Sequence, residues 1–90
     1  MLPQNVNPGN FTVDRIIYND PNEQFAIAVG TWNDDGSVRF AMRWTGNQSN
    51  ANDLGYPKVF THPMWFQLPT DIAPILGSIL NNLNQGNARI

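Results

Sequence analysis

Residues 25–44 have the sequence FAIAVGTWNDDGSVRFAMRW, and this stretch decides the fold. Two runs that suit strands flank the sequence NDDG, and Asp-Gly is a favoured pair in tight hairpin turns. The stretch therefore predicts a β-hairpin. A turn centred on Asp35-Gly36 places Trp32 opposite Arg39, whereas a four-residue loop slides the pairing by two positions and keeps the same faces.

Side chains alternate across a strand with period two, so the hairpin has two faces. One face carries large side chains: Phe25, Ile27, Val29, Thr31, Val38, Phe40, Met42 and Trp44. The other face combines small residues with indole and guanidinium groups: Ala26, Ala28, Gly30, Trp32, Ser37, Arg39, Ala41, Arg43 and Thr45. We expect the large face to lie against a helix and the small face to leave space for a ligand.

Three further segments complete the predicted fold. Residues 11–18 form a first strand, with Phe11, Val13 and Ile17 on one face beside Arg15, and residues 58–68 form a fourth extended segment. Pro63 makes this fourth segment an edge strand or a bulged one, and its best strand piece is 64–68. The fold class is therefore α+β: a four-stranded antiparallel sheet followed by one C-terminal amphipathic helix (ββββα).

The helix is predicted from an apolar stripe at helical spacing, formed by Ile72, Ile75, Leu76, Ile79, Leu80 and Leu83. Thr70 or Asp71 can cap its first turn, because either side-chain oxygen reaches the free N–H groups there. Gly86 is a plausible end of the helix. Gly77 lies inside it, and we explain this glycine by close packing.

Length and composition predict one small domain, residues 11–85, with a flexible arm at 1–10 and a tail at 86–90. A domain of 90 residues is marginal alone, so we expect a homodimer. Charged residues make up only 13% and the net charge is −2, which argues mildly against a general polyanion binder. We find no signal-peptide pattern and no apolar run of about 20 residues, and so expect a soluble, cytoplasmic protein without membrane contact.

Residue types that carry catalysis are sparse. The absence of Cys excludes disulfides, thiol nucleophiles and Cys-based zinc sites. His62 is the single histidine, and a structural or surface role is favoured over a catalytic or metal-binding one. Asp34 and Asp35 belong to the turn chemistry of the hairpin. No phosphate-binding, nucleophile-elbow or metalloprotease motif is present. We therefore predict a protein that is not an enzyme, with no catalytic residue, metal or cofactor.

The small face supplies the candidate binding residues. Arg39 and Arg43 lie on this face near Trp32, and guanidinium groups and aromatic rings stack on bases while Arg also binds phosphate. Tyr56 and Lys58, beside a polar loop at 46–56, extend the surface. The predicted nucleic-acid-binding residues are thus Trp32, Arg39, Arg43, Tyr56 and Lys58. The alternative is that Arg39 covers Trp32 in an ordinary cation–π pair on the solvent side of the sheet.

Three stretches, TWNDDGSVRFAMRW, GYPKVFTHP and FQLPTDIAPILGSIL, resemble the positive-cofactor-four-like family, which is related in fold to the plant Whirly proteins. The likeness is in the order of elements over residues 25–83. It implies a homodimer that binds single-stranded nucleic acid on a curved sheet face, through Trp32, Arg39, Arg43 and Lys58. The pattern RWTG…LGYPK…HPMWFQLP also resembles short uncharacterised bacterial proteins.

A second function stays open, that of a protein-interaction or assembly module. Its contacts would be exposed aromatics, Trp65, Phe66 and Tyr56, because aromatic residues are enriched at interaction hot spots. Adjacent residues on a strand face opposite sides, so at most one of Trp65 and Phe66 belongs to the core. Salt separates the two functions, since binding to nucleic acid weakens as salt rises and an apolar protein interface responds little.

Overall fold

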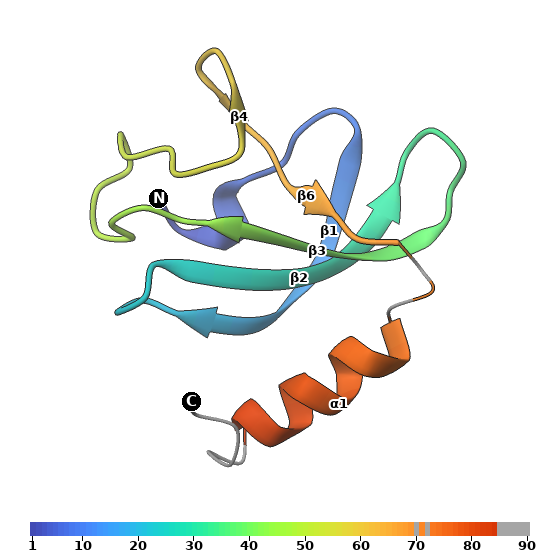
Figure 1. Ribbon diagram of the computed structural model, residues 1–90. Coiled ribbons are helices and arrows are strands. Elements are labelled where there is room, and N and C mark those ends of the chain that lie inside the picture. The colour runs from blue at the N-terminus through green and yellow to red at the C-terminus, as the bar shows by residue number, and fades with distance from the viewer. Residues whose placement is uncertain (70, 72, 85–90) are drawn as a thin grey trace.

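The computed structural model describes residues 1–69, 71 and 73–84. Four antiparallel strands form one sheet in the order β1-β2-β3-β6, and a helix follows them (Figure 1). The sheet strands are β1 (Phe11–Asp20), β2 (Phe25–Trp32), β3 (Val38–Trp44) and β6 (Phe66–Gln67), and the helix is α1 (Ala73–Asn84). The predicted antiparallel four-stranded sheet with a C-terminal helix is therefore confirmed.

The fourth extended segment is more broken than predicted. Residues 58–63 leave the main sheet and pair with themselves, as β4 (Lys58–Val59) and β5 (His62–Pro63). Only β6 returns to the sheet, where Gln67 pairs with Ala41 and Phe66 with Met42. β6 lies at the edge of the main sheet, as expected for this segment, and Pro63 itself lies in β5 of the separate two-stranded sheet.

The central hairpin forms with the four-residue loop. Ile27 pairs with Met42 and Val29 with Phe40, and the Trp32 N–H donates to the carbonyl of Ser37 at 2.9 Å. The pairing is thus slid by two positions from an Asp-Gly-centred turn. Because the shift is even, each face keeps the members that the sequence pattern assigned to it.

The environment of the small face is the opposite of the prediction. Ala26, Ala28 and Ala41 are fully buried and share a core cluster with Phe11 and Trp65. A Cβ atom on Gly30 would lie 2.7 Å from Cζ of Phe11. The space that we expected a ligand to use is therefore filled by large side chains of the same chain. Short side chains on a strand allow such close approach.

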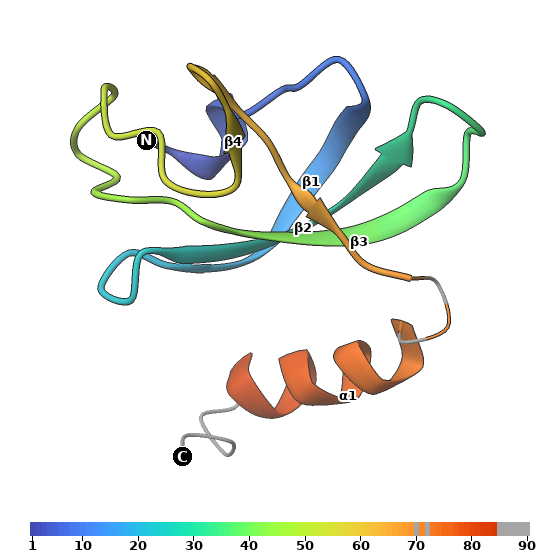
Figure 2. The same ribbon diagram turned by 45° about the horizontal axis from the view of Figure 1, so that its top comes forward.

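The first ten residues do not form the loose arm that was predicted. Pro3–Asn5 form a short 3₁₀ helix, η1, and Val6 is fully buried in the core. The indole Nε1 of Trp65 donates a hydrogen bond of 2.8 Å to the carbonyl of Val6. This segment and the β4–β5 hairpin lie on one side of the sheet and α1 lies on the other (Figure 2).

β1 contains two register shifts, between Val13 and Arg15 and between Ile16 and Tyr18. Each shift changes which face the following residues occupy. Ile16 therefore packs against the core cluster that contains Phe11, whereas Ile17 packs against the cluster of the large face. The expectation that Phe11 and Ile17 share a face was wrong for this reason.

The helix packs on the large face through Leu76, which is 8% exposed and clusters with Ile27 and Leu68. Ile75, predicted to belong to the buried stripe, is 63% exposed. Gly77 is exposed as well, and apart from its chain neighbours and the nearby backbone of α1, no described atom lies within 4 Å of a Cβ built on it, so close packing against another described element does not explain it.

The predicted cap Thr70, the stripe residue Ile72 and the helix end at Gly86 lie outside the described residues, as do the side chains of Ile79, Leu80 and Leu83. Within the described part of the chain, no helix has the length and apolar character needed to cross a membrane.

Candidate functional site

Arg43, predicted to contact nucleic acid, points into the protein and is 2% exposed. Its guanidinium donates to the main-chain carbonyls of Leu54 and Met64, and to that of Pro57 at 3.5 Å. It also lies 5.9 Å from the ring centre of Trp65. Burial lowers the pKa of Arg43 to about 10, so the group still carries its charge at neutral pH. Arg43 fastens the 54–64 segment to β3 and presents no free charge to a ligand.

Arg39 and Trp32 form the ordinary pair that was the alternative interpretation. The guanidinium carbon lies 4.2 Å from the ring centre of Trp32, and Nε donates to the Ser37 hydroxyl at 2.9 Å. Nη2 lies 3.5 Å from a carboxylate oxygen of Asp35. This pair is at the loop end of the hairpin, where the Trp32 N–H closes the turn onto Ser37.

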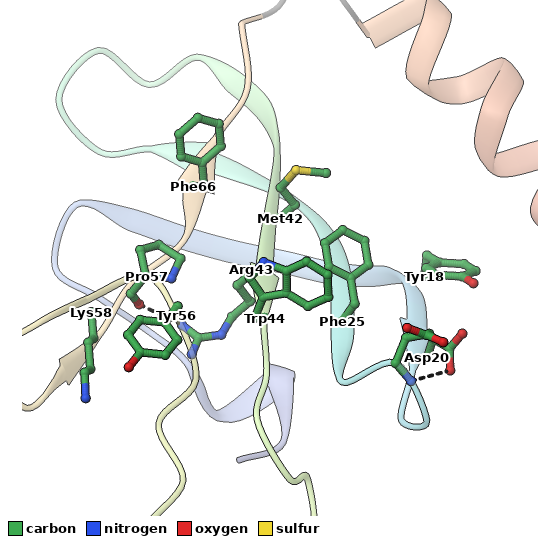
Figure 3. Close-up of a pocket in the computed structure, with 11 residues that line it drawn as sticks. Tyr18, Asp20, Phe25, Met42, Arg43, Trp44, Tyr56, Pro57, Lys58 and Phe66 are labelled. Carbon is green, nitrogen blue, oxygen red and sulfur yellow. Dashed lines mark hydrogen bonds between the residues drawn. The ribbon is translucent and has the colours of Figure 1, made fainter.

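The five predicted residues are therefore split among three places. Arg43 is in the core, and Trp32 with Arg39 is beside the hairpin loop. Tyr56 and Lys58 remain exposed and close together, with the Lys58 ammonium 5.3 Å from the ring centre of Tyr56. These last two border a groove on the large face of the sheet (Figure 3).

Strand pairing builds this groove from two rows of side chains that cross the large face. Directly paired residues on neighbouring strands lie on the same face and close together. One row consists of Asp20, Phe25, Trp44 and Tyr56, and the next consists of Tyr18, Ile27, Met42 and Phe66. All of these except Ile27 line a hollow of about 870 Å³, which we call the aromatic groove.

Three large aromatic side chains in the aromatic groove are more than half exposed: Trp44 at 55%, Phe66 at 59% and Tyr56 at 62%. Phe25 supports Trp44 from the neighbouring strand, with ring centres 5.1 Å apart and ring planes tilted by 58°. Tilted pairs at this distance are a favourable aromatic arrangement. The groove therefore offers an exposed apolar surface in which Trp44 is packed against Phe25.

The position of Tyr56 is set by the main chain. Its N–H and carbonyl each form a 2.8 Å hydrogen bond with Trp44, which continues the sheet beyond β6. Gly55 has φ +64°, and a Cβ there would lie 2.0 Å from the Trp44 carbonyl oxygen. Arg43, on the opposite face, donates to the carbonyls of Leu54 and Pro57, the two residues that flank the Gly55-Tyr56 pair. The buried cation is thus a positioning residue for one wall of the groove.

Charged groups lie at opposite ends of the groove. Asp20 is at the β1–β2 end, and Lys58 is at the far end beside Tyr56 (Figure 3). Glu23 lies in the turn between β1 and β2 and also lines the groove. One oxygen of Asp20 accepts hydrogen bonds from the N–H groups of Asn22 and Glu23, which orders this turn. In the part of the chain that the structure describes, no cluster of His, Asp and Glu is suited to hold a metal ion.

The adjacent pair Trp65 and Phe66 divides as the strand geometry requires. Trp65 is 4% exposed and belongs to the core, whereas Phe66 is in the groove. The sequence reasoning did not single out Trp44, Phe25, Met42 or Tyr18 as site residues. The signal was present in the large hairpin face, which carries more aromatic surface than one short helix needs to pack against.

Comparison with protein-family models, with curated proteins and with solved structures found no match for this chain.

Proposed function

We propose that this protein is a small, non-enzymatic binding module that holds an apolar, aromatic-bearing segment of a partner protein in the aromatic groove. The observation that supports this is the half-exposed trio of Trp44, Tyr56 and Phe66 on neighbouring strands. Aromatic residues are enriched at the centres of protein interfaces. Fully burying one large apolar side chain is worth about 1.5–3 kcal/mol, so covering three half-exposed ones contributes a few kcal/mol.

Charge favours a protein segment over single-stranded nucleic acid in this groove. Phosphate neutralisation supplies a large share of nucleic-acid affinity. Among the described lining residues Lys58 is the one exposed cation, because Arg43 is buried, and Asp20 and Glu23 oppose it with two carboxylates. The five residues that were predicted to bind nucleic acid do not lie together on one exposed surface. Contacts of Tyr56 and Lys58 with nucleic acid stay a prediction that the experiment below also tests.

The test is selection of binders from a displayed library of random peptides. We expect selected peptides to be rich in aromatic residues and to bind the unmodified protein. Trp44→Ser and Phe66→Ser should each weaken binding by about tenfold or more, as expected for hot-spot residues. Moderate salt should change the affinity little.

Val38→Ser is the matched control, because Val38 is 66% exposed but lies beside the hairpin loop, outside the lining of the groove. It should bind the selected peptides like the unmodified protein. Equal loss in all three variants, or no enrichment of any peptide, would contradict the proposal. Labelled single-stranded oligonucleotides form a second arm. Salt-dependent binding that Lys58→Ala and Tyr56→Ala reduce would favour nucleic acid instead.

A further inference from the structure

The β4–β5 hairpin presents a second apolar feature at its tip, which lies outside the groove lining, although Lys58 at the base of the hairpin lines the groove. Lys58 pairs with Pro63 and Val59 with His62, which leaves Phe60 and Thr61 at the tip. Phe60 is 89% exposed and Val59 is 53% exposed. In Figure 1 this hairpin forms a narrow loop that projects above the sheet. An aromatic side chain at such a tip has no apolar surface of its own domain to cover it.

The main chain at Phe60 makes this placement more unusual. Its φ is +55°, in the left-handed region that glycine and asparagine occupy readily and that bulky residues disfavour. A glycine at this tip would relieve the backbone cost and remove an exposed ring. Unfavourable backbone geometry of this kind concentrates at functional positions. The exposed ring and the backbone together indicate a contact outside the fold.

We propose that the partner segment in the aromatic groove is the β4–β5 hairpin of a second copy of this chain, with Phe60 inserted between Trp44 and Phe66. This inference rests on the proposed function, because it names the occupant of the same groove. The groove, at about 870 Å³, has ample room for a phenyl ring. The ring would meet aromatic and thioether side chains, with which aromatic groups pack well.

Charge complementarity selects a second copy as the occupant. The hairpin segment 56–64, YPKVFTHPM, contains Lys58 and His62 and no acidic residue. The β1–β2 end of the groove carries Asp20 and Glu23. Docking the hairpin brings the Lys58 ammonium of one copy toward the carboxylates of another. Two grooves placed face to face could form a similar charge pair, but they would leave the ring of Phe60 uncovered, because Phe60 does not line the groove.

The hairpin tip that carries Phe60 and the aromatic groove are different surfaces, so each copy of the chain can contribute one tip and one groove to an assembly. Contacts of this type close into a reciprocal pair or continue head to tail. Both arrangements share one property that an experiment can use. A copy without the tip still offers a groove, and a copy with a damaged groove still offers a tip.

Sedimentation velocity over a range of protein concentrations tests the inference. The unmodified protein should associate as its concentration rises. Phe60→Ser and Trp44→Ser should each stay monomeric under conditions where the unmodified protein associates, a loss of at least about tenfold in affinity. An equimolar mixture of these two variants should form a one-to-one dimer, because one tip and one intact groove remain. Val38→Ser should behave like the unmodified protein, and circular dichroism should show that every variant is folded.

Several results would overturn the inference. They are a protein that stays monomeric to millimolar concentration, association that survives Phe60→Ser, and a variant mixture that remains monomeric. Binding to neutral lipid vesicles that depends on Phe60 without self-association would also overturn it. If the unmodified protein is monomeric but binds library-selected peptides through Trp44 and Phe66, this inference fails and the proposed function stands. If Trp44→Ser affects neither peptides nor association, the proposed function fails as well.

Discussion

At the scale of single residues, Arg43 links the interior of the protein to the groove. Burying a cation is costly unless its donors are satisfied, and here main-chain carbonyls of Leu54, Pro57 and Met64 accept from the two terminal nitrogens of Arg43, while its buried Nε has no partner among the described residues. Those carbonyls belong to a segment with little regular structure. The arginine therefore replaces the strand partners that this segment lacks, and it keeps Tyr56 in place beside Trp44.

Arg43→Met tests this structural role. Methionine has an apolar side chain of comparable length but leaves the three carbonyls without their donor. We expect the free energy of unfolding, measured by urea denaturation, to fall by about 2–4 kcal/mol. The control is Arg15→Met, because Arg15 is exposed and pairs with the neighbouring Asp14. Exposed pairs contribute little, so this change should stay within about 0.5 kcal/mol. Equal effects of the two substitutions would contradict a structural role for Arg43.

At the scale of elements, the described packing contact between α1 and the sheet is made by Leu76, in the first half of the helix. Leu76 is buried against Ile27 and Leu68, whereas Ile75 and Gly77 face solvent. Most helical stability in proteins comes from packing of an apolar face, and glycine inside a helix adds an entropic cost. Gly77 therefore lowers the stability of α1 at a position where the described surroundings leave room for a side chain.

Gly77→Ala should raise the free energy of unfolding by about 0.5–1 kcal/mol, because alanine has the higher helix propensity and its Cβ meets no described atom of another element within 4 Å. Urea denaturation followed by circular dichroism measures the change. Gly36→Ala is the control, and it should change the free energy of unfolding in the opposite direction. A Cβ there is equally unhindered, but Gly36 has φ +73°, so alanine should cost about 1–2 kcal/mol. Destabilisation by Gly77→Ala would show that the helix packs against something at this position.

At the scale of the whole molecule, the sheet divides two unlike environments (Figure 2). On one side η1 and Trp65 close tightly over small residues. On the other, α1 packs at Leu76, while Trp44 and Phe66 stay more than half exposed. A chain of 90 residues has little apolar surface to spare, and this much exposed aromatic surface supports the proposal that a partner covers the groove.

The hairpin, the membership of its faces and the helix could be predicted from local periodicity. The sequence does not predict which of the two faces is buried. Period-two alternation assigns each side chain to a face, but it carries no information on which other parts of the chain pack against that face. That choice depends on long-range contacts, such as the packing of Phe11 beside Gly30 and the hydrogen bond from Trp65 to Val6. The groove likewise depends on pairing between Trp44 and Tyr56, which are separated by a polar loop with no strand signal.

The central claim is that the small face of the sheet is buried against Trp65, whereas the part of the large face that forms the aromatic groove is exposed. Fluorine NMR of protein labelled with fluorotryptophan, in the presence of a neutral paramagnetic gadolinium chelate, tests it most directly. The Phe60→Ser protein should be used so that self-association does not cover the groove. The fluorine signal of Trp44, at 55% exposure, should relax fastest, and that of Trp65, at 4%, slowest. Protection of Trp44 together with rapid relaxation of Trp65 would contradict the account.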